Sequence, residues 1–391
     1  MTYRFPLASS TWDKNELNAI QRVIDSDRFT MGSHVKEFEK RFAEYIGTKY
    51  AVMVNSGSSA NLIAVASLFY TKDKEKQLKK GDEVIVPSIS WSTTYFPLYQ
   101  YGLKIKFVDI DLETLNIDIE QLNEAITERT KAIFCVNLLG NSSNYSAIKK
   151  IVKDKNILIL EDNCESLGAE YEHKMNGSYG IVGTHSSFFS HHISTMEGGI
   201  AVTNDEELYQ IMLSIRAHGW TRDLPDKNLI SNKDQNNKFD ECFKFVLPGY
   251  NLRPLEMSGA IGIEQLKKLP DLIRARRENA NLFKEVMLNN ENLLIQKEIG
   301  KSSWFGFSMI IKPESNITRK KLLQKLEELS IETRPIVAGN FTNNLAIKYL
   351  DYEIHNKLTI SDYVDKNGLF IGNHHYPLDS MFEILKTIDK I

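Results

Sequence analysis

Two adjacent histidines, His191 and His192, lie in the stretch SSFFSHHISTMEGGIAV, between an apolar run and a Glu-Gly-Gly turn. Neutral imidazole is a suitable base for proton transfer near neutral pH, because the pKa of free histidine is about 6.5. In an arbitrary protein such a pair is more often structural than catalytic. No H-x-x-x-H or H-E-x-x-H spacing accompanies the pair, so we expect no metal site.

Further residues able to do chemistry follow apolar runs elsewhere in the chain. In NSGSSAN (55–61), Gly57 permits close backbone approach and Ser58 offers a hydroxyl at the start of a predicted helix, whose free N–H groups attract phosphate. Trp91 offers a flat ring surface, and Asp162 offers a carboxylate that must be paired if it is buried. Each feature also has a structural interpretation, namely helix capping, core packing or a hydrogen bond to a neighbouring N–H.

The elements that must position these residues alternate between short apolar runs and amphipathic helical patterns. Strands are predicted from the apolar runs at 49–54, 82–88, 104–111, 131–139, 157–162, 185–189 and 199–205. Helices are predicted between them at 59–72, 119–126 and 146–154. This alternation predicts an α/β fold, with a mainly parallel sheet and helices on both faces. Ligands of such sheets collect beyond the carboxyl ends of the strands.

From about Pro254 onward the pattern changes to mostly helix. The expected elements are a long helix, a strand and a second helix, at 256–290, 302–312 and 318–329. We predict a large α/β domain over residues 1–250 and a smaller α+β domain over residues 251–391. No Pro/Gly-rich linker separates them, so we expect close packing.

Composition excludes several classes of protein. The 391 residues carry a formal net charge of -3, which gives no basic field for nucleic acid. The three cysteines form no C-x-x-C pair, which favours a reducing, cytoplasmic setting. The N-terminal residues do not resemble a secretory signal, and no apolar run reaches about 18 residues, so we expect no membrane segment.

A phosphate cradle, a ring platform and a lone acid at successive strand ends together suit pyridoxal 5′-phosphate (PLP). Its phosphate would lie at the helix start after Gly57, its ring against Trp91, and its protonated ring nitrogen on Asp162. The protonated ring is an electron sink. A PLP enzyme should also carry a lysine that binds the cofactor covalently, but the stretch from Ser186 to His192 contains none.

The chain resembles the DegT/DnrJ/EryC1/StrS family of sugar-nucleotide aminotransferases. The resemblance runs from FTMGSHVKEFEKRFAEYIGTKYAVMVNSGSSAN through GDEVIVPSISWSTT and LEDNCESLGA to GYNLRPLEMSGAIGIEQL. It implies the PLP-dependent transferase fold type I, similar to aspartate aminotransferase. Histidine in place of the lysine is similar to a small subgroup of sugar 3-dehydratases that use pyridoxamine 5′-phosphate (PMP).

The resemblance also assigns the catalytic position. In the family the lysine follows a serine by five positions and precedes the Glu of an EGG turn by six. Counted from Ser186 and from Glu197, both spacings identify His191 as the replacement. The role of His192 stays open.

Cofactor-binding roles carry over residue by residue. The family's phosphate contacts correspond to Gly57, Ser58 and Ser186, its ring-stacking aromatic residue to Trp91 and its pyridine-nitrogen acid to Asp162. Asn251, in GYNLR, corresponds to a phosphate contact made from the other subunit, which implies a homodimer. At Glu165 the family usually has Gln or His; the change is expected to adjust the side of the ring hydroxyl.

The implied activity is PMP-dependent removal of the C3 hydroxyl from a GDP-4-keto-6-deoxy sugar, most closely GDP-4-keto-6-deoxy-D-mannose, with ammonia release. L-Glutamate would convert PLP back to PMP. Such a product would serve dideoxysugar (colitose) synthesis for lipopolysaccharide or capsule. His218, Trp220 and Arg222, in HGWTR, are candidate contacts to the sugar or the diphosphate. Two alternatives stay open: the same reaction on a GDP-4-keto-6-deoxy-heptose, and a non-catalytic protein with the PLP fold.

Overall fold

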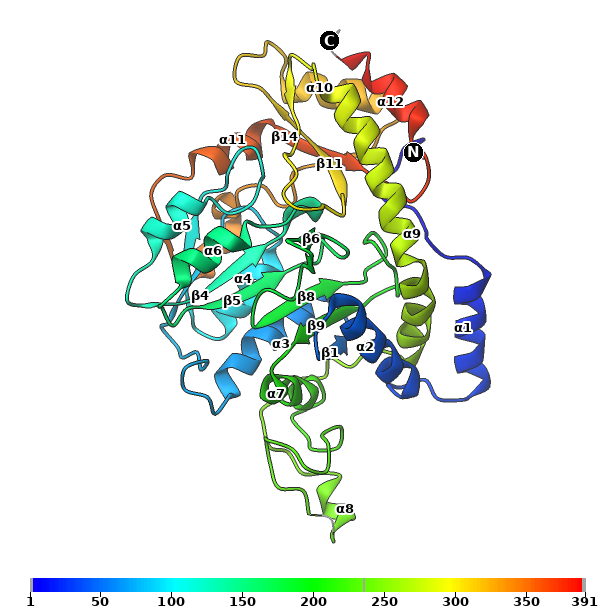
Figure 1. Ribbon diagram of the computed structural model, residues 1–391, viewed down its shortest axis with the longest axis vertical. Helices are drawn as coiled ribbons and strands as arrows, with labels where there is room; N and C mark the ends of the chain where they lie inside the picture. The colour runs from blue at the N-terminus through cyan, green and yellow to red at the C-terminus, as the bar shows by residue number, and fades with distance from the viewer. Residues whose placement is uncertain (1–2, 235, 389–391) are drawn as a thin grey trace.

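The computed structural model describes residues 3–234 and 236–388 of the chain. Figure 1 shows a large sheet covered by helices, a smaller sheet beyond it, and the long helix α9 (Glu256–Met287) running along the side of the molecule past both. None of the helices in the described ranges is both long enough and apolar enough to cross a membrane.

The large sheet, as described, contains eight strands in the order β1-β9-β8-β5-β4-β2-β3-β13. Their bounds are Tyr50–Val54 (β1), Glu83–Pro87 (β2), Lys104–Val108 (β3), Thr130–Val136 (β4), Leu158–Asp162 (β5), Val182–Ser186 (β8), Gly199–Thr203 (β9) and Tyr352–Ile354 (β13). β9 is antiparallel to both of its neighbours, and the remaining pairs are parallel. The predicted α/β class with a mainly parallel sheet is therefore confirmed.

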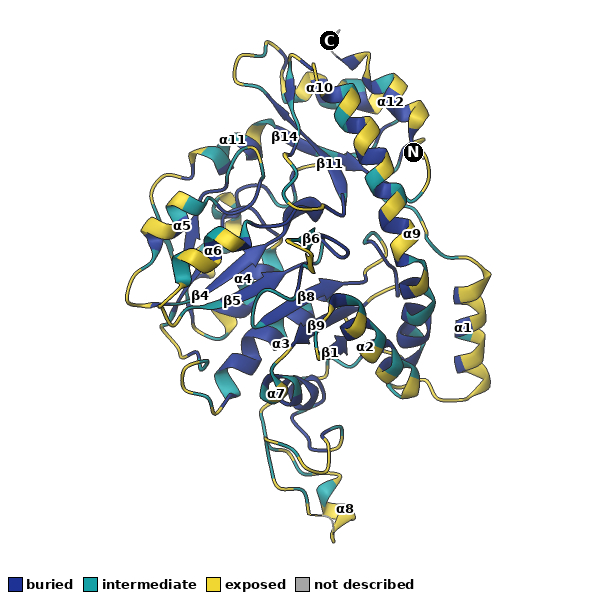
Figure 2. Ribbon diagram, viewed as in Figure 1, coloured by how far each residue is buried: buried dark blue, intermediate teal, exposed yellow. Residues whose placement is uncertain are grey.

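Continuous apolar runs form these strands because both faces of the sheet are buried, as the dark strands of Figure 2 show. Val84 and Val86 of β2 face one core, whereas Ile85 faces the opposite one. The helices that pack on the first face are α3 (Gly57–Tyr70), α4 (Ser92–Gln100) and α7 (Glu206–Arg216). Those on the second face are α2 (Ser33–Ile46), α5 (Ile119–Ala125) and α6 (Tyr145–Val152).

The C-terminal part contains an antiparallel sheet in the order β10-β11-β14-β12. Its strands are Leu293–Leu294 (β10), Gly306–Ile311 (β11), Thr333–Arg334 (β12) and Gly368–Gly372 (β14). The other helices are α1 (Lys14–Asp25), α8 (Lys238–Glu241), α10 (Arg319–Glu328), α11 (Thr359–Asn367) and α12 (Asp379–Leu385), and a small hairpin joins Glu170–Tyr171 (β6) to Lys174–Met175 (β7). An apolar core lies between this antiparallel sheet, the end of α9, α10 and α12.

One predicted strand is displaced. The sequence suggested 185–189, but β8 ends at Ser186, opposite Gly199 of β9. Beyond that pair the chain leaves the sheet, and Phe188 and Phe189 are 41% and 45% exposed. The apolar run in the sequence is therefore longer than the strand, because its last residues belong to the loop.

The division at residues 250 and 251 stays a prediction, and two connections cross it. β13, from the C-terminal part, extends the large sheet beside β3. Within the large sheet itself, Lys106 of β3 forms a buried ion pair with Glu83 of β2, with 2.8 Å between Nζ and Oε2. At the other end of the chain, Phe5 pairs with Ile331.

Glu256, the first residue of α9, holds the start of α2. Its carboxylate accepts hydrogen bonds from the backbone N–H groups of Gly32 (2.6 Å) and His34 (2.7 Å), and it is buried. These N–H groups at the start of a helix have no carbonyl partner within it.

We predict that Glu256→Gln lowers the free energy of unfolding by about 1.5–3 kcal/mol, because charge-assisted hydrogen bonds are lost. Urea denaturation of the wild type and the variant measures the difference. Glu264→Gln, on the same helix, removes only ion pairs to the exposed Arg22 and Lys267 and should cost less than about 1 kcal/mol. Equal unfolding midpoints for Glu256→Gln and wild type would contradict the capping role.

Candidate active site

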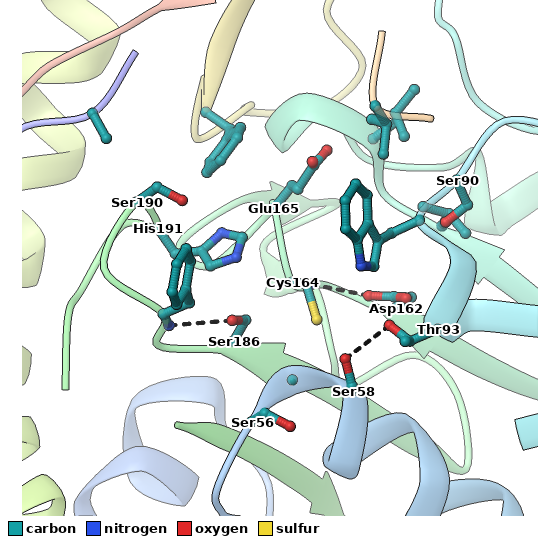
Figure 3. Close-up of a pocket in the computed structure, with 18 of the residues that line it drawn as sticks. Ser56, Ser58, Ser90, Thr93, Asp162, Cys164, Glu165, Ser186, Ser190 and His191 are labelled. Atoms are coloured by element: carbon teal, nitrogen blue, oxygen red, sulfur yellow. Dashed lines mark hydrogen bonds between the residues drawn. The ribbon is translucent and has the colours of Figure 1, made fainter. Parts of the chain in front are cut away.

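A cavity of about 730 Å³ opens at the carboxyl ends of β1, β2, β4, β5 and β8, and part of its wall comes from the C-terminal sheet. It brings together seven of the residues selected from the sequence: Gly57, Ser58, Trp91, Asp162, Glu165, Ser186 and His191. Figure 3 shows several of these side chains converging on it.

The start of α3 forms one end of the cavity. The hydroxyl of Ser56 caps the helix by accepting from the backbone N–H of Ser59, and Ser58 Oγ donates to Thr93 Oγ1 at 3.0 Å. A side chain cannot be added at Gly57, since its Cβ would lie 2.8 Å from Ser186 Cβ and 2.9 Å from Cys164 Sγ. A glycine-lined helix N-terminus flanked by serine hydroxyls suits a phosphate group.

Asp162, at the end of β5, is held by three donors. Its Oδ2 accepts from Asn61 Nδ2 and from Thr94 Oγ1, each at 2.8 Å, and its Oδ1 accepts from the backbone N–H of Cys164 at 3.1 Å. The residue is buried, and in the described ranges no Lys, Arg or His side chain forms an ion pair with it. A buried, oriented carboxylate without a cation suits a ligand that carries a positive charge.

Glu165 lies near Asp162 in the cavity wall and accepts a hydrogen bond from the backbone N–H of Leu139 at 2.9 Å. Desolvation raises the pKa of its carboxyl group to about 7, and the charge of Asp162 acts in the same direction. A carboxyl group with that pKa can hold or release a proton near neutral pH.

His191 projects into the cavity from the loop between β8 and β9 (Figure 3). Its ring lies against Phe305, with 5.2 Å between ring centroids, and edge-on to Phe188 at 6.2 Å. Desolvation, together with a smaller effect of the positive charge of Arg276, lowers the pKa of its imidazole to about 4. The ring is therefore uncharged at neutral pH, the state that a base requires.

His192 points away from the cavity and is completely buried. Its Nε2 lies 3.2 Å from the carbonyl oxygen of Ser303, to which it donates. The two imidazoles that the sequence placed side by side thus have different surroundings.

Trp91 stands immediately before α4, lines the cavity and is 59% exposed. An indole exposed to this extent at a cavity wall leaves a face free for a flat ligand.

Four of the residues selected from the sequence lie outside this chain's cavity. Asn251 is exposed, with its Oδ1 accepting from Arg253 Nε at 3.0 Å. The guanidinium carbons of Arg222 and Arg253 lie 4.0 and 5.4 Å from the centre of the Trp220 ring, and the ring of His218 meets that ring edge-on. Their assigned roles stay predictions.

The cavity also contains residues that sequence reasoning missed. Leu7 comes from the N-terminal segment, Phe305 from the segment before β11, and Glu332 and Arg334 from the region of β12. The backbone N–H of Leu7 donates to Glu332 Oε2 at 2.9 Å. Of these residues, Arg334 has a recognisable sequence context, because it begins the polar, glycine-containing turn RPIVAGNF (334–341).

Residues 10–375 match the DegT/DnrJ/EryC1/StrS aminotransferase family. The chain belongs to this family. As a family member it is 61% identical over 387 residues to a GDP-4-keto-6-deoxy-D-mannose 3-dehydratase of Yersinia pseudotuberculosis, and the match covers 98% of each chain.

Two crystal structures of GDP-4-keto-6-deoxymannose-3-dehydratase are also similar to this chain. One is a histidine-to-asparagine mutant of GDP-4-keto-6-deoxymannose-3-dehydratase (ColD) with bound GDP-perosamine, 57% identical, with a TM-score of 0.97 and coverage of 99% and 100% of the two chains. The other is a GDP-4-keto-6-deoxymannose-3-dehydratase with a trapped PLP-glutamate geminal diamine, 58% identical, with a TM-score of 0.96 and coverage of 98% and 100%. The predicted fold is confirmed.

The cavity fits the cofactor of this family. A phosphate suits the start of α3, where a Cβ at Gly57 would collide with Ser186 and Cys164. A protonated ring nitrogen would supply the cation that Asp162 lacks. No group of three or more His, Cys, Asp or Glu in the described parts of the chain is arranged to hold a metal ion.

We predict that, in the cofactor-free protein, the imidazole of His191 titrates near pH 4 rather than near pH 6.5. Because the pKa is lower in the folded than in the unfolded chain, the ring stabilises the fold above about pH 6.5, and this contribution is lost as the pH falls towards 4. NMR of ¹⁵N-labelled histidine measures the titration, and His191→Asn assigns the signal. A midpoint near 6.5 would contradict the desolvation.

Proposed function

We propose that the chain is a PLP- and PMP-dependent sugar-nucleotide 3-dehydratase that acts on GDP-4-keto-6-deoxy-D-mannose. The observation that carries this function is His191, an uncharged imidazole in a cavity whose other residues suit the cofactor. The net reaction converts the 4-keto-6-deoxy sugar and L-glutamate into a 4-keto-3,6-dideoxy sugar, 2-oxoglutarate and ammonia. The C3 hydroxyl leaves as water, and one water is consumed when ammonia is released.

The residues that would hold the cofactor are those at the strand ends. Gly57, Ser58 and Ser186 would receive the phosphate, Trp91 would cover one face of the ring, and Asp162 would hold the ring nitrogen protonated. When bound, PMP supplies an amine that can combine with the C4 ketone and a ring that accepts an electron pair.

His191 moves the proton. Its neutral imidazole takes a proton from the carbon next to the amine and, once protonated, is the nearest acid for the departing C3 hydroxyl. An imidazole does not form the stable covalent link to the cofactor that lysine forms. Without a lysine, no amine of the chain can release the sugar from the cofactor before the hydroxyl leaves. This favours elimination over simple transamination.

The amination half-reaction needs L-glutamate in the same cavity. The relative with a PLP-glutamate adduct supports this co-substrate. Glu165, with a pKa raised to about 7, lies on the side of the cavity assigned to the ring hydroxyl and can share a proton there.

The proposal includes a homodimer in the cytoplasm, with Asn251 completing the partner's phosphate site, and a role in colitose synthesis for lipopolysaccharide or capsule. An arm of residues 225–234 and 236–246 projects beyond α7 (Figure 1). It exposes Phe239, Phe243 and Phe245. Exposed aromatic residues gathered on one arm support contact with a second copy of the chain.

The decisive assay combines the purified protein, PLP and L-glutamate with GDP-4-keto-6-deoxy-D-mannose and measures ammonia and the deoxygenated sugar. The corresponding GDP-4-keto-6-deoxy-heptose is tested beside it. Turnover of the heptose alone would overturn the hexose assignment. No ammonia from either sugar would overturn the dehydratase function and leave the non-catalytic alternative.

Asp162→Asn should lower kcat by about 10²–10³-fold, because an amide cannot stabilise a positive ring nitrogen as a carboxylate does. Steady-state ammonia release and the absorbance of the bound cofactor measure the effect. Asp271→Asn, at an exposed position on α9, is the matched control and should leave kcat unchanged. A variant at Asp162 with wild-type kcat would refute the assignment.

His191→Asn should lower kcat for dehydration by about 10²–10⁴-fold, the usual contribution of a positioned base. His173→Asn serves as control, because His173 is exposed and has a positive φ that asparagine tolerates. His191→Lys should bind PLP covalently, which borohydride reduction and intact mass spectrometry detect, and should lose dehydration. Full dehydration by the lysine variant would show that another group is the base.

A further inference from the structure

The loop that carries His191 is a closed hairpin extending β8 and β9. Its base is held by backbone hydrogen bonds from Ser187 to Gly198 (2.9 Å) and from Phe189 to Met196 (3.1 Å). Beyond these bonds lies a six-residue tip, 190–195, which holds both histidines. The backbone N–H of His191 also donates to the carbonyl of Phe188 at 2.9 Å, and the further contacts of the tip are made to other parts of the chain.

One side of the tip is attached to the C-terminal part of the chain through His192. Its Nε2–H donates to the carbonyl of Ser303 at 3.2 Å, and its ring lies 5.7 Å from that of Phe305. The acceptor is itself held in place, because the backbone N–H of Ser303 donates to Gly140 and that of Phe305 to Leu139, each at 3.0 Å. The side chain next to His191 is thus tied to a rigid segment of backbone.

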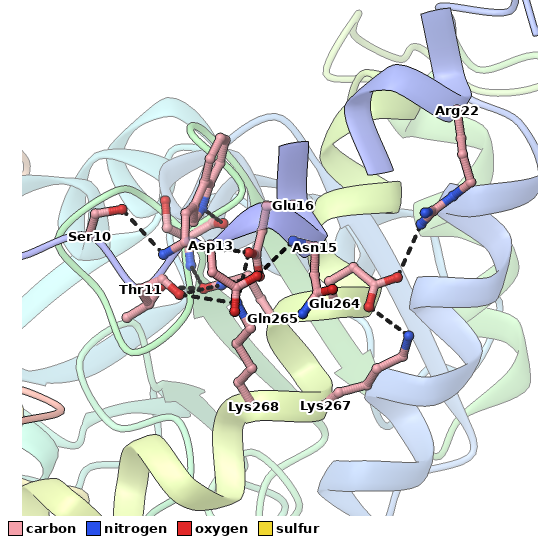
Figure 4. Close-up of polar contacts among 12 residues, drawn as sticks. Ser10, Thr11, Asp13, Asn15, Glu16, Arg22, Glu264, Gln265, Lys267 and Lys268 are labelled. Atoms are coloured by element: carbon pink, nitrogen blue, oxygen red, sulfur yellow. Dashed lines mark hydrogen bonds and ion pairs between the residues drawn. The ribbon is translucent and has the colours of Figure 1, made fainter. Parts of the chain in front are cut away.

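The other side of the tip is attached to the N-terminal segment and to α9 through Ser194. Trp12 Nε1 donates to the carbonyl of Ser194 at 2.9 Å, and the backbone N–H of Ser194 donates to Gln265 Oε1 at 3.0 Å. Gln265 is held in turn by Thr11, at 2.5 Å, and by Glu16, at 2.7 Å. Figure 4 shows these polar contacts between the N-terminal segment and α9.

We propose that His192 and Trp12 are positioning residues for His191, which clamp the hairpin tip from opposite sides through Ser303 and Ser194. Neither side chain lines the cavity, so neither touches the reacting atoms. A base must lie within hydrogen-bond reach of the carbon whose proton it takes, and a shift of about 1 Å can cost about 100-fold in rate. The clamp rests on the proposed function of His191 as that base.

His192→Phe and Trp12→Phe test the clamp, because each deletes one N–H donor and keeps an aromatic ring. In the holoenzyme each should lower kcat by about 10-fold, with unchanged KM for the nucleotide sugar and unchanged affinity for PLP. His192→Gln, whose Nε2 can still reach Ser303, should recover most of the rate. Lys267→Met, which removes only an exposed ion pair to Glu264 beside Gln265, should match the wild type.

Hydrogen–deuterium exchange of peptide 187–198, read by mass spectrometry, gives a measure that does not depend on turnover. Exchange should be faster in both phenylalanine variants and unchanged in Lys267→Met. If His192→Phe does not fold, Trp12→Phe decides the question from the other side of the tip.

Wild-type kcat or unchanged exchange in a folded phenylalanine variant would overturn the clamp. Equal losses of kcat and of PLP affinity that His192→Gln does not reverse would also overturn it, because they indicate general damage to the site. Failure of the wild type to release ammonia would count against the proposed function instead, while the exchange measurement would still test the clamp.

Discussion

Desolvation of the His191 imidazole is the constraint on which the rest of the site depends. A base must be uncharged before it accepts a proton, and desolvation by the cavity wall, with a smaller effect of Arg276, lowers the pKa of this ring to about 4. Arg276 is itself buried and donates to the carbonyls of Phe305 (3.1 Å) and Asn373 (2.8 Å). Its charge is thus solvated by backbone dipoles, and it continues to act on the histidine. The same desolvation raises the pKa of Glu165 to about 7. One cavity therefore contains an uncharged histidine that can accept a proton and a carboxyl group that can hold or release one.

Glu165 and His191 are connected through one backbone contact, between Leu139 and Phe305, which we call the junction. The N–H of Leu139 donates to Glu165, and its carbonyl accepts from the N–H of Phe305, whose ring lies against His191. The junction is strained, since Leu139 and Trp304 both have positive φ angles, of 52° and 47°. It is also crowded: a Cβ on Gly140 would lie 2.6 Å from the backbone nitrogen of Trp304. Such strain persists only where surrounding contacts hold it. Here those contacts join the strand ends of the large sheet to the segment that leads into β11.

Much of the fold could be predicted, because a strand buried on both faces appears in the sequence as a continuous apolar run. β1 to β5 begin and end within three residues of the predicted ranges for this reason. The strand at 185–189 was misplaced, since the loop after β8 also contains apolar residues. Two of these apolar residues, Phe188 and Phe189, line the cavity. β13 was not predicted either: it is short, only partly buried, and pairs with a strand far away in the sequence.

For the site, the sequence by itself determined which side chains stand at the strand ends, because the carboxyl ends of parallel strands meet at one edge. Seven of the selected residues consequently share one cavity. The resemblance to the family, through the distances from Ser186 and Glu197, identified His191 but left His192 unexplained. Only the tertiary structure decided that His192 turns towards Ser303, that Trp12 reaches Ser194, and that Arg334 lines the cavity. These contacts join residues more than 100 positions apart, and their geometry is set by the packing of whole elements, which no local pattern records.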